Sequence, residues 1–167
     1  MSNLKEILIN KKNCKSIWFM RQAGRYLPEF KKIRSQNQNF INLCLNSELS
    51  SEITLQPIKR FDLDSAIIFS DILLVPYALN QKVEFLKNQG PRLENFNFDK
   101  YLRNNDINFI EKLKPVYKAI EITRKKLNKE KSLISFIGAP WTLLIYMMGA
   151  KSSKKEIDLK IINKKKN

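Results

Sequence analysis

The sequence contains no histidine and has few residues suited to binding a metal ion. Its 167 residues include only two cysteines, Cys14 and Cys44, and they do not form a Cys-X-X-Cys pair, so two free thiols in a reducing compartment are expected. Mechanisms that need a histidine base, a histidine-ligated metal or a Ser–His pair are excluded within this chain. Any chemistry must therefore use Arg, Asp, Tyr, Lys or backbone groups.

Long apolar stretches and acidic residues are also scarce. Apolar runs such as residues 72–75 are too short to cross a membrane, and residues 1–13 lack the apolar core of a secretory signal, so we expect a cytoplasmic protein with no membrane partner. The 16 acidic residues are outnumbered by 31 Lys and Arg, which gives a formal charge of +15. This excess indicates either an anionic partner or, as we favour, only the Lys, Asn and Ile enrichment of A/T-rich codon usage.

Three short apolar runs, at residues 17–20, 66–69 and 133–137, are separated by segments with helical patterns. None of the runs alternates between polar and apolar residues, which is typical of strands buried on both faces in a parallel sheet. The sequence therefore predicts an α/β fold with a parallel sheet.

Several local signals predict where helices and turns lie. Ser47 is expected to cap a helix that Pro57 kinks or ends nearby. Pro115 is expected to begin a second helix, whose apolar face would hold Val116, Tyr117, Ile120, Thr123 and Leu127. Residues 83–85 read as a strand of a hairpin with a turn at Gly90-Pro91. Residues 1–150 would form the domain, and lysine-rich residues 151–167 a solvated helix or frayed tail.

A polar or glycine-bearing segment follows each apolar run, at residues 21–25, 70–71 and 138–141. Active sites of α/β proteins gather at the carboxyl ends of strands. Arg21 and Arg25 flank Gly24, which suits either bidentate binding of carboxylates or simple exposure to solvent. Asp71 follows a run so apolar that its carboxylate needs a partner, whether a ligand, a helix end or a salt bridge. Tyr146, taken alone, reads as a core or surface tyrosine.

Three longer motifs resemble one known family. The segments MRQAGRYLPEF, LQPIKRFDLDSAIIFSDILLVP and FIGAPWTLLIYMMG resemble the signature blocks of uroporphyrinogen decarboxylases, in the family's order and at about its spacing. The resemblance extends over about residues 18–149. It implies a (β/α)8 TIM-type barrel with its cleft at the carboxyl ends of the strands. Because such a barrel takes roughly 250 residues, the chain would hold the amino-terminal strand–helix units only, a partial barrel.

The resemblance also implies a reaction and a site. The family removes carbon dioxide from the four acetate side chains of uroporphyrinogen III, giving coproporphyrinogen III in haem biosynthesis, without a metal or organic cofactor, and works as a homodimer when full length. Asp71 would accept the pyrrole N–H groups of this tetrapyrrole, and Arg21 would assist proton delivery. The residues implied to bind substrate are Arg21, Gln22, Ala23, Gly24, Arg25, Asp71 and Tyr146.

Three alternatives remain at this point. One alternative is a truncated, inactive product, since half a barrel leaves strand edges and apolar faces uncovered. A basic nucleic-acid-binding module would explain the charge, but the sequence lacks a zinc site, a helix-turn-helix pattern and an aromatic-basic patch, so we expect no nucleic-acid partner. A related barrel family of zinc-dependent methyltransferases would need Cys and His ligands, and this chain has no His.

Overall fold

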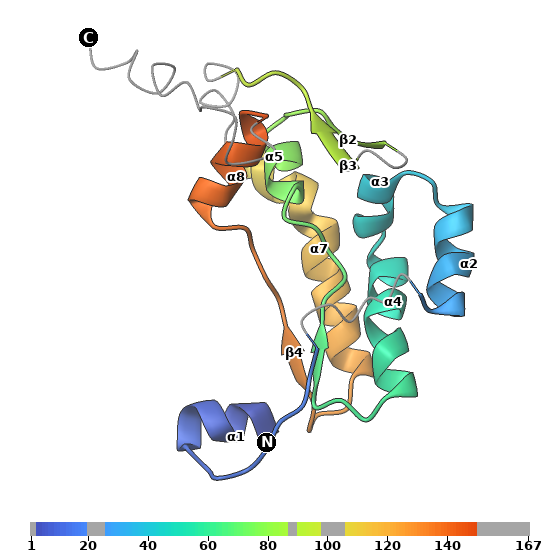
Figure 1. Cartoon of the computed structure of the whole chain (residues 1–167), viewed down its shortest axis with the longest axis vertical. Coiled ribbons are helices and arrows are strands. Elements are labelled where there is room, and N and C mark those ends of the chain that lie inside the picture. The colour runs from blue at the N-terminus through green and yellow to red at the C-terminus, as the bar shows by residue number, and fades with distance from the viewer. Residues whose placement is uncertain (1–2, 20–25, 87–89, 98–105, 150–167) are drawn as a thin grey trace. The chain divides into compact units, whose positions relative to one another are not determined.

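The structure, a computed structural model, describes residues 3–19, 26–86, 90–97 and 106–149 (Figure 1). The chain divides into two compact units, and each is described by itself. The first unit comprises Met1–Asp71 and Ile110–Ile137, and the second comprises Ile72–Phe109 and Gly138–Asn167. The predicted α/β class is confirmed. The strands of the described residues form two separate two-stranded sheets and no closed barrel.

The sheet of the first unit is a parallel pair of β1 (Ser65–Ile67) and β4 (Ser132–Ile134). Residue Ser65 pairs with Ser132 and Ile67 with Ile134, and the Ile68 N–H extends the ladder by donating to the Ile134 carbonyl at 3.0 Å. All three residues of β1 are buried, as predicted for this apolar run, whereas those of β4 are half-buried. The two strands are therefore neighbours in space although a long crossover separates them in sequence.

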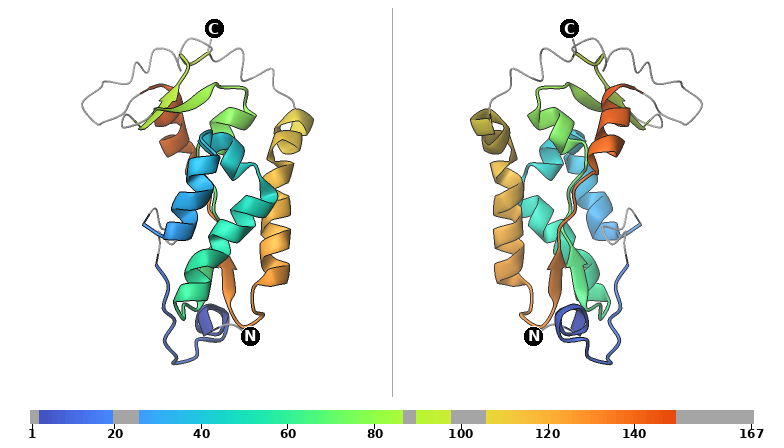
Figure 2. Two further views of the ribbon diagram at one scale, coloured as in Figure 1. Left: turned by 90° about the vertical axis from the view of Figure 1, so that its right-hand side faces the viewer. Right: turned by 90° about the vertical axis from the view of Figure 1, so that its left-hand side faces the viewer.

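Helices cover this sheet in the first unit. Helix α4 (Ser47–Arg60) packs against β1, and α2 (Pro28–Gln36) and α3 (Phe40–Cys44) pack against α4 (Figure 2). Helix α1 (Asn3–Asn10) contacts β4. A cluster of Leu55, Ala66 and Leu127 joins α4, β1 and the segment after α7 (Asp106–Lys126), with Ile58 and Leu133 packed against it. This apolar contact fixes β1 between its helices.

The second unit contains α5 (Leu74–Ala78), the hairpin strands β2 (Val83–Leu86) and β3 (Gly90–Leu93), and α8 (Pro140–Met147). The predicted hairpin is confirmed, with antiparallel pairs from Val83–Leu93 to Leu86–Gly90. The turn predicted at Gly90-Pro91 is wrong, because these residues are the first two of β3. Gly90 has a φ of +76°, a conformation that glycine adopts without strain. Helices α5 and α8 contact each other.

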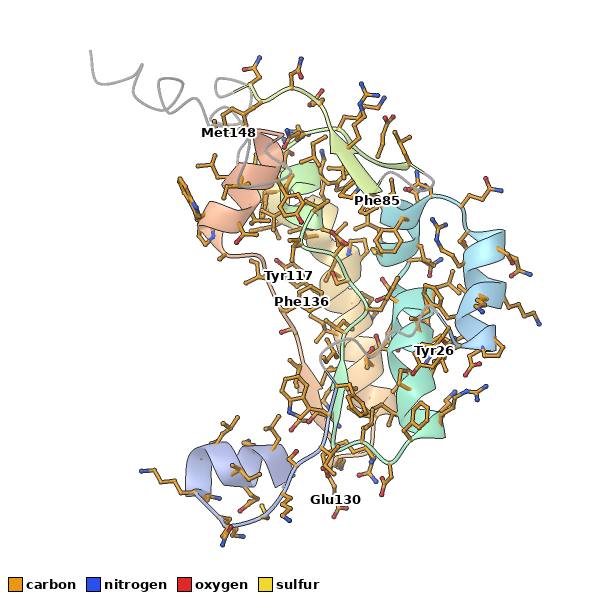
Figure 3. All side chains as sticks on the ribbon, viewed as in Figure 1. Tyr26, Phe85, Tyr117, Glu130, Phe136 and Met148 are labelled. Carbon is orange, nitrogen blue, oxygen red and sulfur yellow. The ribbon has the colours of Figure 1, made fainter. Side chains whose placement is uncertain are left out.

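The prediction that Pro115 begins a helix was wrong. Helix α7 starts at Asp106 and contains Pro115 in its interior, because the residues on both sides keep a helical pattern that buries Leu113 and Ala119. The predicted apolar face was also shifted. Thr123 and Leu127 are buried, but Tyr117 is 52% exposed (Figure 3). A buried alanine at position 119 shows that α7 approaches its neighbours closely there, which periodicity of large side chains does not reveal.

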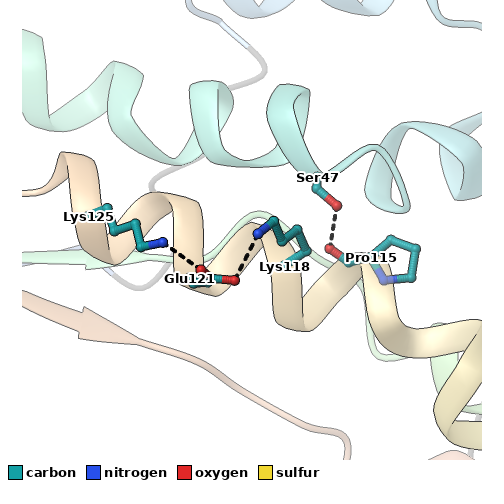
Figure 4. Close-up of polar contacts among 5 residues, drawn as sticks. All are labelled: Ser47, Pro115, Lys118, Glu121 and Lys125. Atoms are coloured by element: carbon teal, nitrogen blue, oxygen red, sulfur yellow. Dashed lines mark hydrogen bonds and ion pairs between the residues drawn. The ribbon is translucent and has the colours of Figure 1, made fainter.

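Ser47 is not the cap of α4. The preceding residue, Asn46, takes this role and accepts a hydrogen bond from the Leu49 N–H at 3.0 Å. The Ser47 hydroxyl instead donates to the Pro115 carbonyl of α7 at 2.8 Å (Figure 4). Pro57 does lie near the end of α4, as predicted, and its carbonyl accepts from the Phe61 N–H.

Of the three predicted strands, the first is absent at residues 17–19, and the third is shorter than predicted. Residues 17–19 form no strand, and the side chains of Ile17 and Phe19 are 60% and 62% exposed. This segment is bonded to Asp64, where the Ile17 N–H donates to the Asp64 carboxylate at 2.7 Å and the Ile17 carbonyl accepts from the Asp64 N–H. Strand β4 ends at Ile134, and Phe136 beyond it is exposed (Figure 3). A strand that is buried on both faces needs packing neighbours on both sides. The described residues supply no such pair of neighbours to residues 17–19 or to the residues beyond β4.

The lysine-rich stretch 151–167 lies outside the described residues, so the proposed boundary near residue 150 stays a prediction. Within the described ranges, no helix is long and apolar enough to span a membrane.

Candidate functional site at the carboxyl end of β1

Asp71 lies where the chain leaves the carboxyl end of β1. The main chain continues from β1 through Ile68 and Phe69, both buried, to Ser70 and Asp71, both half-buried. Asp71 thus stands at the edge of the apolar core and is partly shielded from water as a residue. A charge in such a position interacts more strongly with a bound partner than a fully solvated one does.

Helix α4 holds the end of this strand through three buried groups that we call the Phe69 clamp: the side chains of Ser50 and Thr54 and the main chain of Phe69. The Ser50 hydroxyl donates to the Phe69 carbonyl at 2.6 Å, and the Phe69 N–H donates to Thr54 Oγ1 at 2.8 Å. The Thr54 hydroxyl donates in turn to the Ser50 carbonyl at 2.7 Å. Both main-chain polar groups of Phe69 are therefore satisfied by side chains of α4, as buried polar groups require.

Aromatic contacts hold the Phe69 side chain. Its ring meets those of Phe30 in α2 and Phe40 in α3 edge-on, with centroids 6.0 and 5.8 Å apart. The guanidinium of Arg34 lies over the Phe40 ring, 5.7 Å from its centroid. Aromatic pairs in this geometry add to the stability that burial alone provides. Phe69 is thus fixed through both its main chain and its ring.

The thiol of Cys44 responds to the charge of Asp71. Burial raises the pKa of the Cys44 thiol above its ordinary value, the negative charge of Asp71 raises it further, and the positive charge of Arg34 opposes the shift. Cys44 is therefore an uncharged thiol and not a nucleophile, since the thiolate is the reactive form. The charges of Asp71 and Arg34 therefore act on the same buried thiol with opposite effects.

Tyr146 belongs to the second unit, near the end of α8, and its side chain is partly exposed. The segment leading into this helix is tightly packed. A Cβ on Gly138 would lie 2.6 Å from Cδ2 of Leu143 and 3.2 Å from Cβ of Ile72. The helix ends at Met147, and Gly149, two residues beyond it, has a φ of +74° and an N–H that donates to the Tyr146 carbonyl at 3.0 Å.

The segment of the sequence that carries the other predicted site residues lies outside the described residues. It contains Arg21, Gln22, Ala23, Gly24 and Arg25, so their placement beside Asp71 stays a prediction. Within the described part of the chain, no three Cys, Asp or Glu side chains come together in a group that could hold a metal ion.

Sequence reasoning missed Ser50 and Thr54. A signal was present, because the two hydroxyl residues stand four apart in a helix and so share a face. Small hydroxyl side chains on a buried helix face indicate hydrogen bonds to a neighbouring main chain. The pattern became informative only once that face was known to contact β1.

Comparison with known proteins agrees with the motif evidence. The family model described as "Uroporphyrinogen decarboxylase (URO-D)" matches residues 11–166. Curated proteins named uroporphyrinogen decarboxylase are similar to this chain. That of Rickettsia felis is 48% identical over 141 residues, which are 83% of this chain and 40% of the relative. That of Orientia tsutsugamushi is 50% identical over 141 residues, 84% of this chain and 41% of the relative.

The chain spans about two fifths of the length of these relatives. The family match, by contrast, extends over most of the chain, from the segment before Asp71 to residues beyond Tyr146. On this evidence, the chain belongs to the uroporphyrinogen decarboxylase family.

Proposed function

We propose that this chain supplies the central carboxylate of an enzyme that removes carbon dioxide from the four acetate side chains of uroporphyrinogen III, giving coproporphyrinogen III. The family membership and the names of the relatives support this activity. The observation that carries the proposal is the position of Asp71, a half-buried carboxylate at the carboxyl end of a buried strand. The chain would form the amino-terminal part of a TIM-type barrel, where active sites lie at this end of the strands.

The chemistry explains why a carboxylate is needed. Decarboxylation of an acetate side chain leaves an electron pair that requires a sink. Protonation of an electron-rich pyrrole carbon creates a cation that can accept this pair. A carboxylate held beside the ring accepts hydrogen bonds from the pyrrole N–H groups and stabilises the positive charge as it develops. In this proposal Asp71 acts without a metal or an organic cofactor.

The remaining predicted residues receive the roles that the family resemblance implies. Arg21 and Arg25 would bind substrate carboxylates through their planar guanidinium forks, and Arg21 would assist proton delivery. The main chain of residues 22–24 would add contacts in the same loop. Tyr146 would lie near the reacting acetate. The complete enzyme would be a cytoplasmic homodimer.

The test is to join this chain to the part of the Rickettsia felis enzyme that it does not cover, and to measure conversion of uroporphyrinogen. We expect the fusion to release carbon dioxide and the chain alone to be inactive, because the described strands form only isolated pairs. A folded fusion, verified by circular dichroism, that does not convert uroporphyrinogen would contradict the proposal.

A further inference from the structure

We propose that the Phe69 clamp positions the Asp71 carboxylate, so that Ser50 and Thr54 are positioning residues for the reaction. This inference rests on the function proposed above. Neither residue is expected to touch substrate, because their hydroxyls are buried and their hydrogen bonds are made to main-chain groups.

The hydrogen bonds of the clamp have a single consistent direction. A hydroxyl has one proton, and that of Thr54 is donated to the Ser50 carbonyl. A lone pair of Thr54 Oγ1 then accepts from the Phe69 N–H. The proton of Ser50 goes to the Phe69 carbonyl. With both of its polar main-chain groups engaged, the peptide plane on either side of Phe69 is restrained from rotating.

The clamp binds the main chain just beyond the last hydrogen bond between β1 and β4. The Ile68 N–H makes the last hydrogen bond from the β1 segment to β4 among the described residues. The next residue, Phe69, is bonded to α4 side chains instead. Asp71 follows only two residues later, a reach of at most about 7 Å. The anchor of Phe69 thus limits where the Asp71 carboxylate can lie relative to a ligand.

The chain offers two matched controls. Thr123 in α7 is also buried, and its hydroxyl donates to the Ala119 carbonyl at 2.6 Å, the same backward bond that Thr54 makes within its own helix. No bond from a strand to Thr123 is found within the described residues. Ser51 is buried beside Ser50, and its hydroxyl has no hydrogen-bond partner there.

The first experiment measures amide hydrogen exchange on the full chain, with Thr54→Val compared against Thr123→Val and Ser50→Ala against Ser51→Ala. We expect Thr54→Val and Ser50→Ala to speed exchange of the Phe69 and Asp71 amides more than that of amides in α7. The controls should change exchange only in proportion to global stability. Thr54→Ser, which keeps the hydroxyl, should retain protection. Equal effects of Thr54→Val and Thr123→Val at Phe69 would overturn the inference.

The second experiment measures kinetics on the fusion with the Rickettsia felis enzyme. Misplacement of a catalytic group by about 1 Å costs up to roughly 100-fold in rate, so we expect Thr54→Val to lower kcat about 10- to 100-fold with little change in KM. Thr54→Ser and Thr123→Val should retain kcat. If the unaltered fusion is inactive, the proposed function is wrong. Hydrogen exchange then still tests whether the clamp restrains the main chain at Phe69. If the fusion is active and Thr54→Val keeps its kcat, this inference is wrong and the proposed function stands.

Discussion

The side-chain amide of Gln81 donates to the main-chain carbonyl of Met147 at 2.9 Å, across 66 positions of sequence. The same nitrogen donates to the Glu94 carbonyl after β3, also at 2.9 Å, and the side chain is almost fully buried. One carboxamide therefore ties the hairpin to the end of α8, beside Tyr146. The two N–H groups of an amide allow both bonds at once.

Replacement of Gln81 with Met should destabilise the second unit. The new side chain has a similar length but no donor, so the bonds to the Met147 carbonyl, which is buried, and to the Glu94 carbonyl, which is partly buried, are both lost. We expect a loss of about 1–3 kcal/mol in the free energy of unfolding, measured by urea denaturation. Lys82→Met is the control, since the exposed Lys82 ammonium pairs with the exposed Glu84 carboxylate. Equal stability of the two variants would show that the Gln81 bonds contribute nothing.

Gly138→Ala should destabilise the start of α8. The added methyl group would collide with buried Leu143 at 2.6 Å, closer than non-bonded carbon atoms approach. Overpacking of this kind costs about 1–3 kcal/mol. Urea denaturation should also show that Leu143→Ala relieves part of the penalty, because the two sites are in contact. A strictly additive double variant would contradict the predicted collision.

Glu121 should make the stability of α7 depend on pH. Hydrogen bonds and charge pairing with Lys125 and Lys118 lower the pKa of Glu121 to about 2, from an ordinary value of 4.5 (Figure 4). Because the folded-state pKa is depressed, the stabilisation is complete above pH 4.5 and is lost as the pH falls toward 2. We expect Glu121→Gln to lower the Tm at neutral pH, with the difference vanishing near pH 2.

Salt provides the control for this ion-pair prediction. The three side chains are exposed, so added salt should screen their attraction and shrink the Tm difference at neutral pH. A Tm difference that stays constant from pH 7 to pH 2 would contradict the assignment to charge.

The 167-residue chain alone should be weakly stable or prone to aggregate. Among its described residues, Ile17, Phe19, Phe136 and Ile137 expose apolar side chains beside the strands of the first unit. Native domains retain only about 5–15 kcal/mol, so uncovered apolar surface of this kind matters. We expect a low melting temperature. A sharp, reversible melt of the monomer would count against this expectation.

Local chemistry allowed parts of the fold to be predicted. The continuous apolar run at residues 66–69 correctly indicated a buried strand, and Val83 and Phe85 indicated the hairpin. The prediction errors arose where two neighbouring residues were equally suitable as a helix cap, or where contacts between distant segments determined the structure. Asn46 and Ser47 are both good helix caps, and the Pro115 carbonyl engages the Ser47 hydroxyl.

The sequence indicated one part of the candidate site, Asp71, but not the clamp beside it. The acid directly after an apolar strand drew attention to Asp71, because a carboxylate there needs a partner, and its role in the site, which the family resemblance implies, stays a prediction. The clamp was not identified, because Ser50 and Thr54 bond to a main-chain carbonyl and N–H that carry no sequence signature. Contacts between a side chain and a distant main chain depend on how helix and strand pack, which the order of residues alone does not reveal.

The most direct test of the central claim is Asp71→Asn in the fusion with the Rickettsia felis enzyme. An amide could still meet a pyrrole N–H through its oxygen, but it would bring no negative charge to offset the cation formed on protonation. Loss of a comparable electrostatic group costs about 10²–10³ in kcat. We therefore predict that turnover of uroporphyrinogen falls at least about 100-fold. Near-normal turnover by a folded Asp71→Asn enzyme would contradict the role of Asp71 as the central carboxylate.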